Sequence, residues 1–352
     1  MAIQKIGIDD FVQTADSQII IDVRSPSEYD HAHIPGAISL PLFDNEQRAI
    51  VGTTYKKQSR EDAIKIALPM FGTKMLSMVE EIEKQVQDFQ EKNYGNKPTL
   101  FVHCWRGGMR SAAVAWLLDL YGYKVAQLIG GYKAYRNWVI AQYSFPYQIK
   151  VLGGYTGSGK TEILHALKLM GENIIDLEGL AKHKGSSFGA LGQEPQPSQE
   201  MFENLLGTAL YNMNDKTECL WVEDESQRIG TVMVPIIFFN LMRDSDCYFM
   251  QIPFEERLHF IVNQYGVFSK EDLIAATLRI QKRLGGLETK NAVTFIEESN
   301  IKDAFSILLK YYDKWYMKFS QPNGKPKLHL NPVEAPTVNP IYNAKLLLDL
   351  NS

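Results

Sequence analysis

Short runs of consecutive apolar residues alternate along the chain with longer segments whose apolar positions recur at helical spacing. A helix is expected over residues 111–121. Strand-type runs are expected at residues 18–23, 99–103, 124–129, 149–152, 173–176, 218–223 and 246–252. Unbroken apolar strands that alternate with helices predict an α/β fold with mostly parallel sheets, buried on both faces.

The segment from residue 42 to residue 98 is rich in Lys, Glu and Gln. It is too long for a simple loop, so we expect a mostly helical insertion there. The strand pattern restarts after Pro146, and a chain of 352 residues suits two domains. We predict domains at 1–144 and 145–352, the second ending in a helical and tail region that proline interrupts from residue 321 on.

The composition is that of a globular protein, with 45% hydrophobic and 22% charged residues. A net charge of −4 excludes a basic chain that binds nucleic acid indiscriminately. Three scattered cysteines do not suggest a disulfide framework or a zinc site. The N-terminus lacks an apolar signal core, and residues 232–242 are far short of the roughly 20 needed to span a bilayer. We expect a cytoplasmic protein with no membrane partner.

One strand-type run leads into Cys104-Trp105-Arg106-Gly107-Gly108-Met109-Arg110-Ser111, and a helical pattern follows. The glycines allow several backbone N–H groups to point inward, and the helix start and both arginines add positive charge. A thiol in this setting should ionise more readily than a free cysteine. We therefore predict Cys104 as a catalytic nucleophile, with Arg106 and Arg110 beside it. A buried structural cysteine is the simpler alternative.

Upstream of this loop, Asp22-Val23-Arg24 precedes His31-Ala32-His33-Ile34-Pro35-Gly36-Ala37. In this order, with the cysteine loop, the first domain resembles a rhodanese domain, which implies a parallel sheet and a structural ion pair of Asp22 with Arg24. His103, Cys104 and Arg110 also match the His-Cys-x5-Arg pattern of cysteine phosphatases. The common sulfurtransferase loop is a residue shorter, so phosphatase chemistry stays open.

A complete G-x-x-x-x-G-K-T pattern, Gly154-Tyr155-Thr156-Gly157-Ser158-Gly159-Lys160-Thr161, stands between a strand and a helix. We predict that amides at Gly154, Gly157 and Gly159 cradle phosphate, that Lys160 reaches terminal phosphates, and that the Thr161 hydroxyl binds Mg²⁺. The second domain is therefore predicted to be P-loop NTPase-like. ATP, GTP and a diphosphate ester present similar oxygens, and the pattern does not distinguish them.

An acidic element should face this loop. The apolar run that ends in Glu223-Asp224-Glu225 is typical of a Walker-B strand, so Glu223 or Asp224 is predicted to help hold the metal. Asp176 and Glu178, after another strand-type run, are alternatives. A solvated cluster that caps the next helix is the simpler explanation.

Several short segments are each common to many proteins, but their combination is specific to one family. They lie at residues 103–111, 153–161, 176–183 and 222–226. In combination they resemble the tRNA 2-selenouridine synthase family, as do residues 48–53 and 282–286. The resemblance runs from about Ile21 to Tyr316.

This resemblance implies replacement of sulfur by selenium in 2-thiouridine at the wobble position of tRNA. Selenophosphate is the implied selenium donor, and geranyl diphosphate the implied source of an S-geranyl intermediate. Cys104, Arg106 and Arg110 would serve the selenium step, and the P-loop would bind the geranyl diphosphate with Mg²⁺ on Thr161. No tightly bound cofactor is expected. Whether Cys104 carries selenium covalently or only positions the donor stays open.

The implied partners are the anticodon region of tRNA and the enzyme that produces selenophosphate. Two other classes of function explain the loops separately. One is a cysteine phosphatase or sulfurtransferase with an appended nucleotide-binding module. The other is a non-catalytic, nucleotide-gated adaptor.

Because the net charge is negative, a tRNA surface must be a local patch. Lysines neutralise phosphates and aromatic rings stack on unpaired bases. The candidates are Lys310, Lys314, Trp315 and Lys318, with a second basic group at Arg279, Lys282 and Arg283. The spacing of residues 310–319 equally fits a helix with buried aromatic residues and solvated lysines.

Overall fold

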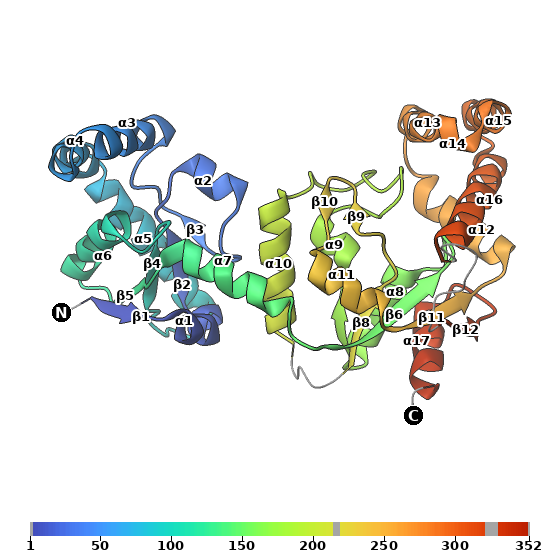
Figure 1. Ribbon diagram of the computed structural model, residues 1–352, viewed down its shortest axis with the longest axis horizontal. Coiled ribbons are helices and arrows are strands. Elements are labelled where there is room, and N and C mark those ends of the chain that lie inside the picture. The colour runs from blue at the N-terminus through green and yellow to red at the C-terminus, as the bar shows by residue number, and fades with distance from the viewer. Residues whose placement is uncertain (1–2, 214–218, 321–329, 351–352) are drawn as a thin grey trace. The chain divides into compact units, whose positions relative to one another are not determined.

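The computed structural model describes residues 3–213, 219–320 and 330–350, without the side chains of residues 317–320. The chain separates into two compact units, Met1–Ala141 and Gln142–Ser352. Each unit is built on its own parallel sheet (Figure 1). The predicted α/β class, with parallel sheets, is confirmed.

The sheet of the first unit has the strand order β1-β5-β4-β2-β3. Its strands are β1 (Gln4–Ile6), β2 (Ile19–Asp22), β3 (Ile38–Ser39), β4 (Leu100–His103) and β5 (Val125–Leu128). Every residue of β2, β4 and β5 is buried, which accounts for their apolar runs. The register pairs Asp22 with His103, so these strands end together, directly before Cys104.

Helices surround this sheet, and the predicted insertion at residues 42–98 is helical. The helices are α1 (Ile8–Thr14), α2 (Pro26–His31), α3 (Asn45–Lys57), α4 (Arg60–Gly72), α5 (Met75–Lys92), α6 (Met109–Tyr121) and α7 (Gly131–Gln142), with a 3₁₀ turn at Ala15–Ser17. In α5, Met78, Val79, Ile82 and Val86 are buried, which is the stripe that one helix face presents to a core.

The sheet of the second unit has the strand order β12-β11-β6-β8-β7. Its strands are β6 (Gln148–Gly154), β7 (Asn173–Ile175), β8 (Cys219–Glu223), β11 (Asp246–Gln251) and β12 (Leu330–Glu334), and β9 (Arg228–Ile229) pairs separately with β10 (Val232–Met233). Residue 218, the predicted start of β8, lies outside the described residues. Since β6 and β8 are parallel neighbours, the P-loop and the acids after β8 share one sheet edge.

The helices of this unit include a group that packs around its own core. They are α8 (Lys160–Leu169), α9 (Leu177–Ala181), α10 (Gln199–Tyr211), α11 (Ile236–Arg243), α12 (Phe254–Tyr265), α13 (Lys270–Arg279), α14 (Gln281–Leu284), α15 (Gly286–Glu297), α16 (Ile301–Ser320) and α17 (Pro340–Asp349). The helices α12 to α16 lie together (Figure 1). Their core includes Leu258, Leu273, Ile296 and Phe305. Beyond residue 329 the tail is regular, because β12 extends the sheet and α17 packs on α8.

Candidate active site

Cys104 is the first residue after β4, and the loop that it begins runs to Gly108, where α6 is capped. The Cys104 side chain is buried, and its Sγ lies 3.2 Å from Oγ of Ser111 in the first turn of α6. Arg106, by contrast, is exposed. The thiol thus lies beside the amino end of a helix, where the backbone dipoles favour an anion.

Two glycines allow this loop to pack directly against the start of α7. Gly107 has a φ of +64°, and a Cβ there would lie 2.3 Å from the carbonyl oxygen of Leu128. A Cβ on Gly131 would lie 2.3 Å from the carbonyl oxygen of Cys104. The amide of Tyr132 donates to that carbonyl at 2.9 Å. The backbone under the thiol is therefore held by contacts that leave no room for side chains.

Gln127, a buried polar residue of β5, orients Ser111. Its Nε2 donates to Ser111 Oγ at 2.6 Å, and Lys5 Nζ donates to its Oε1. Because Ser111 accepts from Gln127, its own proton is available to the Gly108 carbonyl at 3.1 Å or to Cys104 Sγ at 3.2 Å. This polar chain was not predicted, since Gln127 stands inside an apolar strand run.

Arg110 is held by Glu28, a residue of α2. Its two terminal nitrogens donate to the Glu28 carboxylate at 2.7 and 3.4 Å. Arg48 of the helical insertion lies 3.5 Å from the same carboxylate. Burial raises the pKa of Glu28, but hydrogen bonds from Arg110 and Ser25 and the charges of both arginines outweigh it and lower the pKa to about 2. Glu28 is therefore ionised and fixes Arg110 beside the loop.

Asp22 and Arg24 form the buried ion pair that the rhodanese resemblance implies. The closest contact is 2.6 Å, and the Arg24 guanidinium lies 3.9 Å from the ring centre of Tyr132. His103 is fully buried, and burial lowers its pKa. Asp22, Arg24 and His103 therefore have a structural role beside the loop. Within the described residues, none of them forms a hydrogen bond with Cys104 Sγ.

In the second unit, the P-loop connects β6 to α8 and rests on α12. A Cβ on Gly157, whose φ is +83°, would lie 2.7 Å from Ile261 Cγ1 and 2.9 Å from the Arg257 carbonyl oxygen. Lys160 Nζ lies 3.4 Å from the Gly154 carbonyl oxygen, and the segment from Thr156 to Thr161 lines a cavity of about 960 Å³. The strand, loop and helix of the predicted phosphate cradle are all present.

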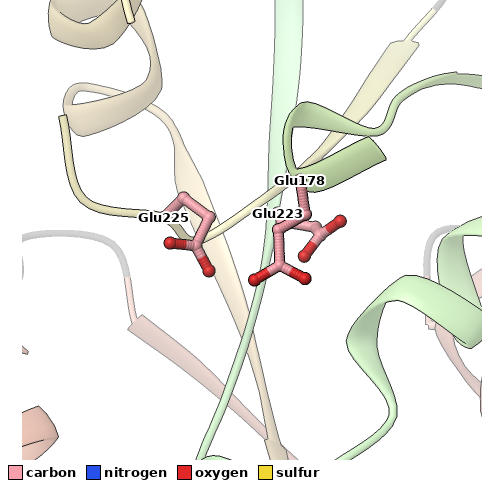
Figure 2. A group of neighbouring side chains, drawn as sticks. All are labelled: Glu178, Glu223 and Glu225. Atoms are coloured by element: carbon pink, nitrogen blue, oxygen red, sulfur yellow. The ribbon is translucent and has the colours of Figure 1, made fainter. Parts of the chain in front are cut away.

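Three glutamates face this loop, and Figure 2 shows them together: Glu178 of α9, Glu223 at the end of β8, and Glu225. Each offers a carboxylate oxygen, and these oxygens lie within 4.8 Å of one another. The Thr161 hydroxyl lies 3.3 Å from both Glu178 and Glu223. This set of oxygen ligands suits a divalent cation such as Mg²⁺.

The electrostatics of the three glutamates also fit a cation. Burial, then the charge of Glu225, raises the pKa of Glu178 to about 9. Burial and the neighbouring carboxylates raise the pKa of Glu223 well above its usual range, and burial raises that of Glu225. Glu223 is fully buried, and its Oε1 has no hydrogen-bond partner within the described chain. A bound cation would neutralise this repulsion and coordinate that oxygen.

The other two predicted acids make separate contacts. Asp176 caps α9 by accepting from the Gly179 amide at 2.7 Å, and it contacts His165 at 2.9 Å. Asp224 accepts from Arg243 at 2.6 Å and from the Tyr316 hydroxyl. Both residues line the cavity, but the structure groups Glu178 and Glu225, rather than these aspartates, with Glu223.

The cavity is also lined by aromatic and aliphatic side chains of α12 and α16. They include Phe260, Ile261, Tyr265, Tyr311, Tyr312, Trp315 and Tyr316. One cavity therefore combines a phosphate cradle and a carboxylate cluster with an apolar wall. A ligand that suits it carries phosphate at one end and an apolar group at the other.

Comparison with known proteins identifies both parts of the chain. A rhodanese-like domain model matches residues 8–137, and a model of the tRNA 2-selenouridine synthase AAA domain matches residues 147–324. The tRNA 2-selenouridine synthase of Nitrosomonas europaea is 38% identical over 268 residues, covering 74% of this chain and 67% of that one. That of Sulfurovum sp. (strain NBC37-1) is 34% identical over 317 residues, covering 84% of each.

The chain belongs to the tRNA 2-selenouridine synthase family. Among solved structures, the N-terminal domain of a putative ATP/GTP binding protein from Clostridium difficile 630 is 37% identical, covering 39% of this chain and 99% of that one. Its TM-score of 0.34 is too low to establish a shared fold.

Members of the tRNA 2-selenouridine synthase family act on tRNA, so we next locate the residues of α16 that were predicted to contact it. Lys310 and Lys314 are exposed on α16, whereas the Lys318 side chain lies outside the described residues. Trp315 turns to the cavity instead, with the Arg283 guanidinium 5.7 Å from its ring centre. Lys310 and Lys314 are thus exposed, while Trp315 is half-buried and lines the cavity.

The second basic group adjoins the cavity through two of its three residues. Arg279, Lys282 and Arg283 are all exposed, and Arg283 lines the cavity. Arg279 donates to the Ser187 carbonyl oxygen at 2.8 Å. These three residues are therefore better placed than Trp315 to meet a polyanion that approaches the cavity.

No described helix is long and apolar enough to cross a membrane.

Proposed function

We propose that this chain replaces sulfur with selenium in wobble 2-thiouridine of tRNA through an S-geranyl intermediate. As a member of its family, it is an enzyme that transfers selenium to tRNA. The finer proposal concerns the two donors. Geranyl diphosphate reacts at the P-loop cavity, and selenophosphate reacts at the Cys104 loop.

The observation that carries the proposal is the composition of the large cavity. The P-loop, the three glutamates and the aromatic residues of α12 and α16 all line this one cavity. The cavity therefore offers both a phosphate cradle and an apolar lining. Geranyl diphosphate uses both, because its diphosphate is attached to a ten-carbon apolar chain.

In the first step, the sulfur of 2-thiouridine attacks C1 of the geranyl chain. The C1–O bond breaks, a C–S bond forms, the N3 proton leaves the base, and inorganic diphosphate departs with the bonding electrons. Amides of the P-loop and Lys160 bind the diphosphate oxygens. Thr161 and the glutamates would hold Mg²⁺, which would neutralise the negative charge of the diphosphate leaving group.

In the second step, selenium replaces the alkylated sulfur. An S-alkyl group leaves more readily than the thiocarbonyl sulfur, since it departs as geranyl thiol. Selenium of selenophosphate bonds to C2 of the base, the C2–S bond breaks, and the geranyl thiolate departs and takes up the proton of the donor. Water then attacks phosphorus, the P–Se bond breaks, inorganic phosphate is released, and N3 regains a proton. Arg106 and Arg110 bind the phosphate of this donor, and the Cys104 thiol lies beside it.

The tRNA binds through its anticodon region, and the exposed Arg279, Lys282 and Arg283 contact phosphates near the cavity. The enzyme that makes selenophosphate is the expected protein partner. A cysteine phosphatase or sulfurtransferase with an appended nucleotide-binding module explains the spacing of Cys104 and Arg110, but it leaves the apolar wall of the cavity without a role.

The test uses the purified full chain and an anticodon stem-loop that contains 2-thiouridine. With geranyl diphosphate and Mg²⁺, mass spectrometry should show the mass of one geranyl group on the stem-loop. Addition of selenophosphate should then convert this product to 2-selenouridine. If neither donor changes the nucleoside, or if selenation needs ATP or GTP and no geranyl diphosphate, the proposal is wrong.

A further inference from the structure

A second, much smaller cavity lies behind the wall of the large one. Its volume is about 20 Å³, and it is closed largely by apolar side chains of the helical region, including Phe305, Leu308 and Leu309. Five residues line both cavities: Thr156, Ser186, Ile261, Tyr265 and Tyr312. These five residues form the partition between the two spaces.

Among these partition residues, two are fixed by the fold itself. Ile261 lies directly under the P-loop, 2.7 Å from the position that a Cβ on Gly157 would take. Tyr265 stacks on Phe305 with ring centres 5.8 Å apart, inside the core of the helical region. A change in either residue would alter the phosphate cradle or the core together with the cavity.

Tyr312 is the third large partition residue, and it packs against the edge of that core. It projects from α16, and its hydroxyl lies 2.7 Å from Oγ of Ser187, which holds the phenol ring across the space between the cavities. Burial raises the pKa of this hydroxyl, so it stays protonated and able to donate. The ring therefore lines both cavities, and the contact with Ser187 holds it in place.

We propose that the Tyr312 ring is the end wall for the prenyl chain and limits the transferred group to ten carbons. This inference rests on the proposed function, and it names the residue that sets donor specificity. The chain extends from the diphosphate on the P-loop toward Tyr312. The transfer is the one described above, with C1–O broken, C–S formed, and diphosphate and the N3 proton released.

The sizes of the groups support this role. An additional isoprene unit brings five carbons, and truncation of tyrosine to alanine removes a ring and a hydroxyl, which are seven heavy atoms. The freed space would join the small cavity behind it, whose apolar lining does not retain water well. The merged space would admit the longer chain, while the P-loop would remain unchanged.

The experiment is a competition between donors on the full-length chain. Equal concentrations of geranyl and farnesyl diphosphate are supplied with the 2-thiouridine stem-loop, and mass spectrometry gives the ratio of the two products. We expect Tyr312→Ala to raise the farnesyl-to-geranyl ratio at least tenfold. Tyr312→Trp should shorten the space and raise the use of dimethylallyl diphosphate relative to geranyl diphosphate. A product ratio does not depend on how much of the variant is folded.

Tyr312→Phe is the matched control, because it keeps the ring and removes only the hydroxyl that contacts Ser187. Its product ratio should equal that of the unaltered chain. An unchanged ratio in both Tyr312→Ala and Tyr312→Trp would overturn this inference and leave the proposed function intact. Should the alanine variant be inactive, Tyr312→Leu and Tyr312→Trp decide by the same criterion. Transfer of no prenyl group by the unaltered chain would instead overturn the proposed function.

Discussion

The hydroxyl oxygen of Thr161 lies 3.3 Å from a carboxylate oxygen of Glu223, which joins the P-loop to the end of the neighbouring strand β8. The same hydroxyl lies 3.3 Å from Glu178. Glu225 completes the group of carboxylates. Because these three closely spaced carboxylates, one buried and two half-buried, repel one another, this arrangement is favourable only with protons or a cation between them.

Glu223→Gln should change stability in two ways, one without Mg²⁺ and one with it. Glutamine cannot ionise, so without Mg²⁺, at a pH above the raised pKa of Glu223, the variant should have the higher melting temperature, by about 2–4 °C for each kcal/mol gained. The stabilisation that Mg²⁺ confers on the unaltered chain should be lost. Thermal unfolding with and without Mg²⁺ measures both effects. Glu297→Gln, at an exposed carboxylate, is the control. If Mg²⁺ stabilises both variants equally, Glu223 does not bind the cation.

The pH dependence of stability follows from Glu178, whose pKa rises from 4.5 to about 9. Between these values the folded chain retains a proton that the unfolded chain has lost. The free energy of unfolding of the Mg²⁺-free protein should therefore fall as pH rises through this window, by up to about 1.4 kcal/mol per pH unit for one retained proton. Mg²⁺ should flatten this dependence. Denaturant unfolding between pH 5 and pH 9 tests it, and a rise in stability with pH would contradict it.

Glu28→Gln should impair the selenium step and leave geranylation unchanged. Loss of the carboxylate charge releases Arg110, which then no longer meets the donor phosphate in a fixed position. We expect the KM for selenophosphate to rise about tenfold, which corresponds to one charge-assisted hydrogen bond. Kinetics on a pre-geranylated stem-loop measure this effect, with the exposed Glu46→Gln as control. An equal loss in both steps would indicate a general structural role instead.

Gly107→Ala should destabilise the first unit. The new Cβ would lie 2.3 Å from the Leu128 carbonyl oxygen, at a φ of +64° that side chains disfavour. A loss of about 1–3 kcal/mol is expected. Gly108→Ala is the matched control, since a Cβ there meets nothing within 4 Å. Similar denaturation midpoints for the two variants would show that the loop backbone is not held as described.

Features that depend on a short stretch of sequence could be predicted, whereas contacts between residues far apart in the sequence could not. The P-loop and β6 follow from a short string and its flanking periodicity, and so does the position of Cys104 after β4. The partner of Arg110 could not be predicted, because Glu28 is 82 positions away and lies on a short helix. The sequence only weakly indicated that Glu178 and Glu225 lie together. The one indication was that each follows a strand that ends at the same edge of the sheet.

The face of α16 was undecided in sequence for a physical reason. Its aromatic residues occur at helical spacing, which fits both a stacking surface and a buried wall. Only the packing of α12 against α16 shows that Tyr312 and Trp315 line the cavity. The cavity depends on side chains from many separate segments, and no single stretch of sequence carries that information.

The most direct test of the two-site account is to supply Lys160→Ala and Cys104→Ala each with the 2-thiouridine stem-loop and with the pre-geranylated stem-loop. Lys160→Ala should fail to geranylate 2-thiouridine, yet convert a pre-geranylated stem-loop to 2-selenouridine with selenophosphate at near the unaltered rate. Cys104→Ala should geranylate normally and accumulate the geranylated product. If Lys160→Ala lost both activities, or Cys104→Ala completed the selenation, the assignment of one step to each loop would be contradicted.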